Sequence, residues 1–159
     1  MIKNHSIDAG IARRVEQIRA EIQAAAARAG RDPGGIRLMA VTKTVPAETV
    51  NSAVAAGVSL LGENRAQELL DKYEHYAPAE IHFIGHLQTN KVRSVVDKVS
   101  MISVDSLRLA QGIAARLEAG QNNGDPAAGK RGGSQASPVF MRKSLQRRCK
   151  LFRGLRTCV

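Results

Sequence analysis

The sequence predicts an α/β fold built on parallel strands. Apolar runs of strand length begin near residues 36, 58, 81 and 99, so successive strands start 22, 23 and 18 residues apart. Each interval holds one strand and one helix, and repeated β-α units imply parallel strands joined by right-handed crossovers. A doubly wound sheet and a (β/α)8 barrel both fit this pattern. A barrel typically needs about 250 residues, so four β-α units in 159 residues amount to half of one.

The N-terminal segment predicts a long helix followed by the first strand. Apolar side chains recur there every three or four residues, at Ile7, Ile11, Val15, Ile18 and Ile22. This spacing places them on one face of a helix. Ser6 or Asp8 can cap its start, and Gly30 can end it. Residues 36–41 form the first apolar run of strand length.

The next elements alternate in the same way. Pro46 suits the first turn of a helix that runs to about Ala56, where Gly57 closes it. The following strands are expected at 58–61, 81–84 and 99–104, and the helices at 63–76, 89–97 and 106–119. Because aromatic residues make up only 3% of the chain, the core must rest on Ala, Val, Ile and Leu.

The formal charge of +10 is concentrated at the C-terminal end. Residues 1–120 carry 15 Lys and Arg against 13 Asp and Glu, a net of +2, whereas residues 121–159 carry 9 against 1, a net of +8. The segment 120–138 is rich in Gly, Ala, Ser, Pro and Asn without periodicity, which is typical of disorder. Residues 139–159 could form a basic helix. We therefore expect a folded part over 1–120 and a separate basic tail over 121–159.

The chain shows no sequence signal for a membrane or for secretion. It contains no apolar run of membrane-spanning length, and its first residues lack the apolar segment of a signal peptide. Cys149 and Cys158 match neither a zinc spacing nor a disulfide framework. We expect a cytoplasmic protein without a metal site.

Polar residues stand where the predicted strands end. Lys43 ends the first strand, Asn64 follows the second, His86 follows the third and Asp105 ends the fourth. In parallel α/β folds these ends share one face, and ligands bind there. Each position alone is explained as well by a solvated loop, and Asp105 with Ser106 could simply cap a helix. Together they predict a binding site.

Lys43 is the most distinctive of these groups. It could be a solvated strand end, a salt-bridge partner or a nucleophile. In a sheltered barrel mouth, desolvation would disfavour the ammonium and free the amine to attack carbonyls. A lysine can form a Schiff base with an aldehyde, and pyridoxal phosphate is the commonest such cofactor. His82 and His86 are separated by a strand and a loop, so they do not predict a helical metal pair.

Four segments resemble the pyridoxal phosphate homeostasis proteins of the YggS/PROSC type, which are related to the N-terminal domain of alanine racemase. These segments are AVTKTVP (40–46), LLGENRAQE (60–68), IHFIGHLQTNK (81–91) and ISVDS (102–106). The resemblance covers roughly residues 7–119 and implies a (β/α)8 barrel of fold-type III that binds pyridoxal 5'-phosphate. It implies that Lys43 holds this cofactor covalently as an aldimine. It further implies that Asn64 and His86 line the cofactor, with His86 beside the pyridine ring.

The same resemblance implies a role in buffering or delivering pyridoxal phosphate, with apo-enzymes as recipients and a monomer as the usual state. It assigns no catalytic residue, because such proteins are not known for robust turnover. A racemase-like enzyme is the first alternative, although the second domain that supplies a catalytic tyrosine in alanine racemases is not recognisable. A nucleic-acid-binding module formed by the basic tail is the second alternative.

The resemblance ends after Ala119. The fifth strand, the Ser- and Gly-rich phosphate cradle and the arginine near the pyridine nitrogen are not recognisable in residues 121–159. We interpret this segment as unrelated to the family, most simply as the frameshifted end of a truncated barrel. Half a barrel would leave open strand edges, so we also expect aggregation or dimerisation.

Overall fold

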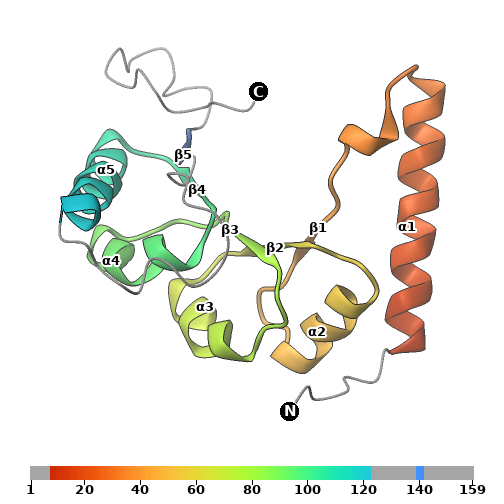
Figure 1. Ribbon diagram of the computed structural model, residues 1–159, viewed down its shortest axis with the longest axis horizontal. Helices are drawn as coiled ribbons and strands as arrows, with labels where there is room; N and C mark the ends of the chain where they lie inside the picture. Colours follow the sequence, from red (N-terminus) through yellow and green to blue (C-terminus); the bar gives the residue numbers. More distant parts are fainter. Residues whose placement is uncertain (1–7, 123–138, 142–159) are drawn as a thin grey trace. The chain divides into compact units, whose positions relative to one another are not determined.

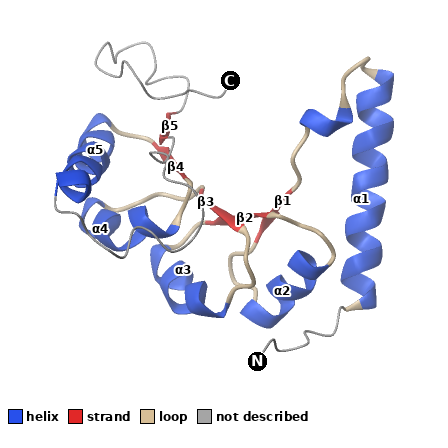
Figure 2. Ribbon diagram, viewed as in Figure 1, coloured by secondary structure: helices blue, strands red, loops and turns tan. Residues whose placement is uncertain are grey.

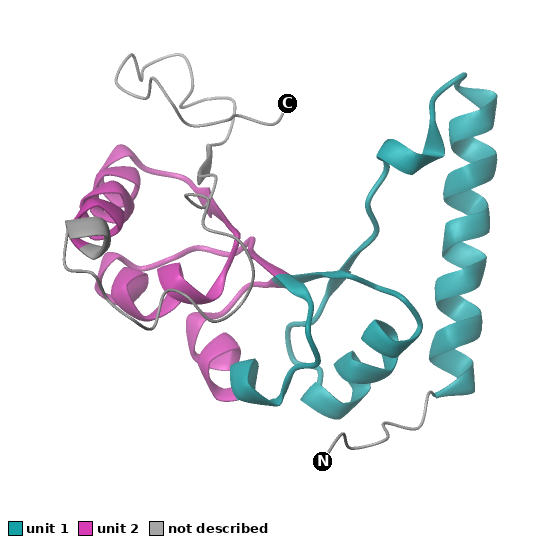
Figure 3. Cartoon of the chain, viewed as in Figure 1, with its two compact units in different colours: residues 1–62, 72–80 teal, residues 63–71, 81–159 magenta. Residues whose placement is uncertain are grey.

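The computed structural model describes residues 8–122 and 139–141 of the chain. The described residues alternate helices with parallel strands (Figures 1 and 2), which confirms the predicted α/β class. They fall into two compact units (Figure 3). Unit 1 comprises residues 1–62 and 72–80, and unit 2 comprises residues 63–71 and 81–159.

The first helix of unit 1, α1, spans Ala9–Arg28. Asp8 caps it, because its carboxylate accepts hydrogen bonds from the backbone N–H groups of Gly10 and Ile11 at 2.8 and 3.2 Å. The chain leaves the helix through Gly30, whose φ of 62° lies in the left-handed region that glycine adopts at little cost. The predicted capping by Asp8 and ending at Gly30 are therefore confirmed.

Two parallel strands and one helix complete the framework of unit 1. Strand β1 (Met39–Val41) pairs with β2 (Leu60–Glu63), and Met39 lies opposite Leu60. Helix α2 (Ala47–Ala55) connects them and packs against α1. β1 is shorter than predicted, because residues 36–38, which follow the 3-10 turn η1 (Pro33–Gly35), have no regular secondary structure.

The core of unit 1 is aliphatic, with one aromatic ring. Its buried apolar side chains are those of Val15, Ala26, Ala47, Val50, Val58, Leu60, Leu61 and Tyr76. Asn51 is buried among them, and its side chain bonds the backbone of His75 and Ala77 at 2.8 and 2.7 Å. These two bonds anchor the short 3-10 turn η2 (Tyr73–His75) to α2.

Unit 2 repeats the alternation of strand and helix. It contains α3 (Ala66–Lys72) except for Lys72, and β3 (Glu80–Phe83) except for Glu80, since these two residues belong to unit 1. Its other elements are η3 (Thr89–Lys91), α4 (Val92–Val95), η4 (Val96–Lys98), β4 (Met101–Val104) and α5 (Leu107–Asn122). β3 and β4 are parallel, and α5 packs against α4 and β4. The hydroxyl of Ser106 accepts a hydrogen bond from the N–H of Leu109 at 3.3 Å, as predicted for the start of the last helix.

Besides the length of β1, three sequence predictions differ from the structure. Glu63 was expected to begin a helix, but it is the last residue of β2 and is fully buried. The helix predicted over 89–97 is broken into the short elements η3, α4 and η4. A basic helix was considered from residue 139, but residues Val139–Met141 form strand β5, parallel to β4.

Within unit 1, β1 neighbours β2, and within unit 2 the strand order is β3-β4-β5. The remainder of the predicted tail, 123–138 and 142–159, lies outside the described residues. The separate basic tail and the fold-type III barrel therefore stay predictions. No helix in the described part of the chain is both long enough and apolar enough to cross a membrane.

Candidate functional site

Lys43 lies in the loop that follows β1, where the sequence placed it. Thr42 is buried and its N–H donates to the carbonyl of Gly62 at 3.0 Å, which continues the β1–β2 ladder by one residue. Lys43 itself is exposed. The expectation that desolvation in a sheltered barrel mouth frees its amine stays a prediction.

The loop around Lys43 has an unusual backbone. Thr44 has a φ of 61°, in the left-handed region that β-branched residues rarely adopt. Its hydroxyl donates to the Lys43 carbonyl at 2.6 Å, and the N–H of Val45 donates to the Thr42 carbonyl at 3.2 Å. The loop is therefore a tight turn that presents Lys43 at its exposed side.

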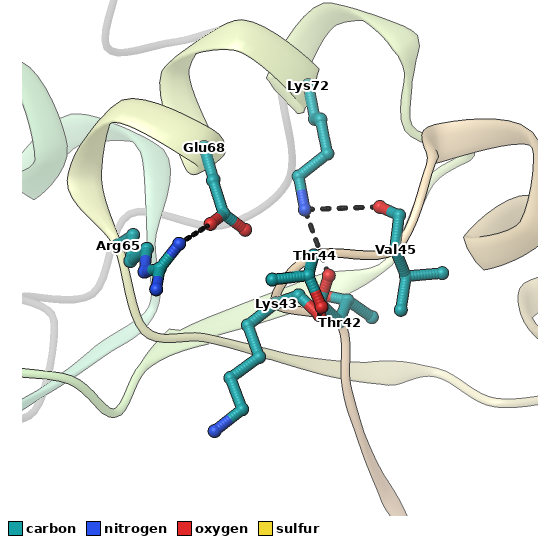
Figure 4. A network of polar contacts seen from close by, with 7 residues as sticks. All are labelled: Thr42, Lys43, Thr44, Val45, Arg65, Glu68 and Lys72. Carbon is teal, nitrogen blue, oxygen red and sulfur yellow. Dashed lines mark hydrogen bonds and ion pairs between the residues drawn. The ribbon is translucent and has the colours of Figure 1, made fainter.

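Lys72 contacts this loop from the end of α3 (Figure 4). Its ammonium donates to the carbonyls of Thr42 and Val45 at 2.9 and 3.3 Å. Figure 4 shows the Lys43 side chain extending away from Lys72. Lys72 was not among the predicted site residues, because a lysine in the last turn of a helix is ordinary and no periodicity distinguishes it.

Unit 2 holds a cavity at the carboxyl ends of its strands. The cavity has a volume of about 240 Å³ and is lined by Asn64, Ile84, Gly85, His86, Ser103, Val104 and Asp105. β3 and β4 are parallel, with Phe83 opposite Ile102, so the residues that follow them meet at the same edge. The structure thus brings together Asn64, His86 and Asp105, as the sequence predicted.

His86 and Asp105 form a hydrogen-bonded pair in this cavity. The imidazole Nδ1 lies 2.7 Å from the carboxylate Oδ2, and the two side chains are 71% and 41% exposed. Because an ionised carboxylate can only accept, Nδ1 donates, and Nε2 of a neutral imidazole is then an acceptor. The pair orients the ring and leaves Nε2 available to a ligand.

Asn64 contributes an unsatisfied acceptor to the same place. Its Oδ1 is buried and has no hydrogen-bond partner among the described residues. A buried polar atom without a partner is rare in proteins and marks a place for a ligand or water. An amide oxygen there can accept a hydrogen bond from a hydroxyl or N–H group.

Gly85 allows the loop after β3 to pass close to Asn64. A Cβ built on Gly85 would lie 1.9 Å from the Asn64 carbonyl oxygen, a distance that no side chain tolerates. The neighbouring backbone is held by the N–H of Ile84, which donates to Glu63 at 2.8 Å. The glycine directly before His86 was visible in the sequence, but its steric reason was not.

Lys43 belongs to unit 1, whereas Asn64, His86 and Asp105 belong to unit 2. The convergence of Lys43 with these three residues stays a prediction. His82 is buried within β3 and His86 is exposed after it, in line with their expected separation. Within residues 8–122 and 139–141, no three His, Cys, Asp or Glu side chains gather in an arrangement that could hold a metal ion.

Unit 2 thus has the arrangement in which α/β folds commonly bind ligands, a polar cavity at the carboxyl ends of parallel strands. No protein-family model matches the chain. Among curated relatives, the pyridoxal phosphate homeostasis protein of Pseudomonas aeruginosa is 42% identical over 113 residues, which cover 69% of this chain and 49% of the relative. The protein of the same name from Escherichia coli K12 is 43% identical over 106 residues, which cover 63% and 45%. The one from Aquifex aeolicus is 42% identical over 106 residues, which cover 65% and 46%.

Solved structures agree with these relatives. The structure of PipY from Synechococcus elongatus with PLP bound is 34% identical with a TM-score of 0.52, and the match covers 64% of this chain and 49% of that one. A protein of unknown function from Bifidobacterium adolescentis gives a TM-score of 0.67 at 28% identity, covering 87% and 73%. The chain spans about half the length of the curated relatives it matches. Over the matched part, it is a homologue of the pyridoxal phosphate homeostasis proteins.

Proposed function

We propose that this protein binds pyridoxal 5'-phosphate through Lys43 and buffers or delivers it in the cell. The observation that carries the proposal is the likeness to PipY, whose structure contains PLP, at 34% identity. The names of the curated homologues support the role in homeostasis. We propose binding without turnover, with apo-enzymes that need the cofactor as recipients.

The residues after β1 support a covalent link. Pyridoxal phosphate supplies an aldehyde that reacts with a primary amine. The Lys43 side chain is exposed, and its amine has no hydrogen bond or ion pair within the described part of the chain. A primary amine that is accessible and not engaged by other groups can be reached by an aldehyde, and its deprotonated form is the nucleophile.

The cavity of unit 2 fits the ring end of the cofactor. Asn64 offers a buried acceptor without a partner, and His86 offers an imidazole held by Asp105. We propose that Asn64 and His86 bind and orient the ring. The seven lining residues include no Lys or Arg, so the groups that neutralise the phosphate must come from elsewhere.

Mapping of the modified lysine tests the proposal. The full chain is incubated with pyridoxal phosphate, reduced with borohydride and digested, and the modified peptides are identified by mass spectrometry. We expect modification at Lys43, loss of it in Lys43→Ala, and retention of it in Lys98→Met, which changes a lysine of η4. Modification spread evenly over other lysines, or none at all, would contradict a cofactor site at Lys43.

A racemase-like enzyme is the second candidate, because the His86–Asp105 pair provides an oriented proton acceptor in the cavity. A carboxylate that fixes the tautomer of an imidazole is typical of acid–base sites. Racemisation of alanine by the wild-type chain, lost in both Lys43→Ala and His86→Ala, would favour this candidate. Cofactor binding without any racemisation would favour the homeostasis role.

A further inference from the structure

We infer that Lys72 is a positioning residue, whose ammonium holds the strained loop Thr42–Val45 in the conformation that presents Lys43 (Figure 4). The inference rests on the proposed role of Lys43, and all of its residues lie in unit 1. Three observations carry it: the backbone of Thr44, the two hydrogen bonds of Lys72 and the ring beneath the lysine stem.

The first observation is the strain at Thr44. A φ of 61° brings the Cβ of an L-residue close to its own backbone, and the branched side chain of threonine makes this worse. Its hydroxyl donates a hydrogen bond to the neighbouring carbonyl of Lys43 at 2.6 Å. Such a conformation persists only where the surrounding structure enforces it, and it is found preferentially at functional sites.

The second observation is that Lys72 holds the loop in this strained conformation. The ammonium of Lys72 donates to the carbonyl before Lys43, that of Thr42, at 2.9 Å, and to the carbonyl after Thr44, that of Val45, at 3.3 Å. One cation thus joins the two ends of the segment that contains the reactive lysine and the strained residue. Hydrogen bonds from a charged donor are stronger than neutral ones, and here they act on partly buried groups.

The third observation is that Lys72 is itself held in place. Its Nζ lies 5.8 Å from the centroid of the Tyr76 ring, and Tyr76 is buried. A cation over an aromatic face is attracted to it, and a half-buried stem has few alternative rotamers. Lys72 is therefore a fixed donor rather than a mobile surface charge.

The two lysines differ in the contacts of their amines. The amine of Lys43 is exposed and not engaged, whereas that of Lys72 is committed to two carbonyls. We therefore expect pyridoxal phosphate to modify Lys43 and to leave Lys72 unmodified. When Lys72 is lost, Thr44 can return to a negative φ, and the direction of the Lys43 side chain changes with it.

The test compares four variants of the full chain. They are Lys72→Met, Lys72→Arg, Thr44→Gly and the double variant that combines Thr44→Gly with Lys72→Met. Two readouts are taken: the rate at which Lys43 is modified by pyridoxal phosphate, and amide hydrogen exchange of residues 42–45. Lys72→Met keeps the length of the stem and removes the donors, so labelling should slow on the order of tenfold and exchange should rise by a similar factor. Lys72→Arg keeps charged donors, so this variant should retain most of the wild-type labelling rate and most of the protection from hydrogen exchange.

Thr44→Gly separates positioning from general stability. Glycine adopts a φ of 61° without strain, so the loop of this variant needs the lysine less. Combining Thr44→Gly with Lys72→Met should therefore recover labelling to within about threefold of Thr44→Gly alone, which is a measurable coupling between the two positions. A merely structural role of Lys72 would leave the double variant as slow as Lys72→Met.

The outcomes distinguish this inference from the proposed function. Labelling of Lys43 in the wild type together with unchanged labelling in Lys72→Met would overturn the inference and leave the cofactor site intact. Absence of labelling in the wild type would overturn the proposed function. In that case the exchange of residues 42–45 decides, because equal exchange in wild type and Lys72→Met would overturn the positioning role as well.

Discussion

The imidazole of His86 and the carboxylate of Asp105 are 2.7 Å apart, although the two residues are separated by 19 positions in the sequence. The register of two parallel strands explains this contact. His82 lies opposite Met101, so the loops that follow β3 and β4 begin at the same edge of the sheet. The pair is therefore a direct product of the β-α-β arrangement rather than of local sequence.

Asp105→Asn should weaken the binding of pyridoxal phosphate while leaving stability almost unchanged. The amide still reaches His86 but no longer orients it through charge, so we expect the affinity to fall several-fold, as measured by absorbance titration. Exposed ion pairs contribute about 1 kcal/mol or less, so the unfolding midpoint in urea should barely move. Asp97→Asn is the control, because it breaks the Arg116–Asp97 pair of the same unit and should leave the affinity unchanged. Equal affinities of Asp105→Asn and wild type would contradict a role of Asp105 in the site.

The sequence predicted the elements whose signals are local. Asp8 caps α1 and Gly57 follows α2 with a φ of 92°, because capping and left-handed turns depend on the residue itself. Lys43 was placed correctly at the end of β1 for the same reason, since an apolar run ended there. These features need no knowledge of distant parts of the chain.

The features that the sequence did not predict depend on tertiary contacts. Because Glu63 is charged, the sequence predicted that a helix begins there, but Glu63 is the last residue of β2. The partners of Lys72 lie 30 and 27 positions away, so no periodicity reveals them. The close approach of Gly85 to Asn64 likewise requires two loops to be brought together by the sheet. Tertiary context overrides local propensity at each of these positions.

Gly85→Ala should destabilise unit 2 and disturb the cavity. The added Cβ would lie 1.9 Å from the Asn64 carbonyl oxygen, and a backbone atom cannot move aside as a flexible side chain can. We expect a loss of about 3 kcal/mol or more in the free energy of unfolding, measured by urea denaturation. Binding of pyridoxal phosphate should fall with it, because Asn64 must shift.

Gly112→Ala is the matched control for that substitution. Gly112 lies inside α5, and a Cβ there would meet nothing within 4 Å. Replacing an unstrained helical glycine by alanine should stabilise the protein by about 0.5 to 1 kcal/mol. Similar losses in both variants would show that the close approach of Gly85 and Asn64 is not the cause.

Asn51→Ala should destabilise unit 1 strongly, although it removes only a small side chain. The side chain is 3% exposed, donates to the His75 carbonyl at 2.8 Å and accepts from the Ala77 N–H at 2.7 Å. Its removal leaves a cavity and two partly buried backbone groups without these bonds, so we expect a loss of about 2 to 4 kcal/mol in the free energy of unfolding. Thr49→Ala, an exposed position on the same helix, should change it by about 0.5 kcal/mol or less. A loss below that of an exposed substitution would contradict the anchoring role of Asn51.

Arg37→Met tests how the ion pair between Arg37 and Glu80 contributes to the stability of unit 1. The side-chain hydrogen bond to Glu80 raises the pKa of Arg37, its burial opposes this rise, and the charge of Glu80 adds to it. Because the folded pKa lies above the unfolded one, the contribution of the pair is fully present below the unfolded pKa. It is lost only as the pH rises through the folded value, in strongly alkaline solution.

The penalty of Arg37→Met should therefore be the same at about pH 7 and about pH 9, since both lie far below the usual range of arginine. The side chains are 51% and 35% exposed, so the penalty should be about 1 kcal/mol or less. It should shrink in about 1 M salt, where charges are screened within about 3 Å. Arg37→Lys keeps the charge and should retain part of the effect. A penalty that falls between these two pH values would mean that a group other than Arg37 controls the pair.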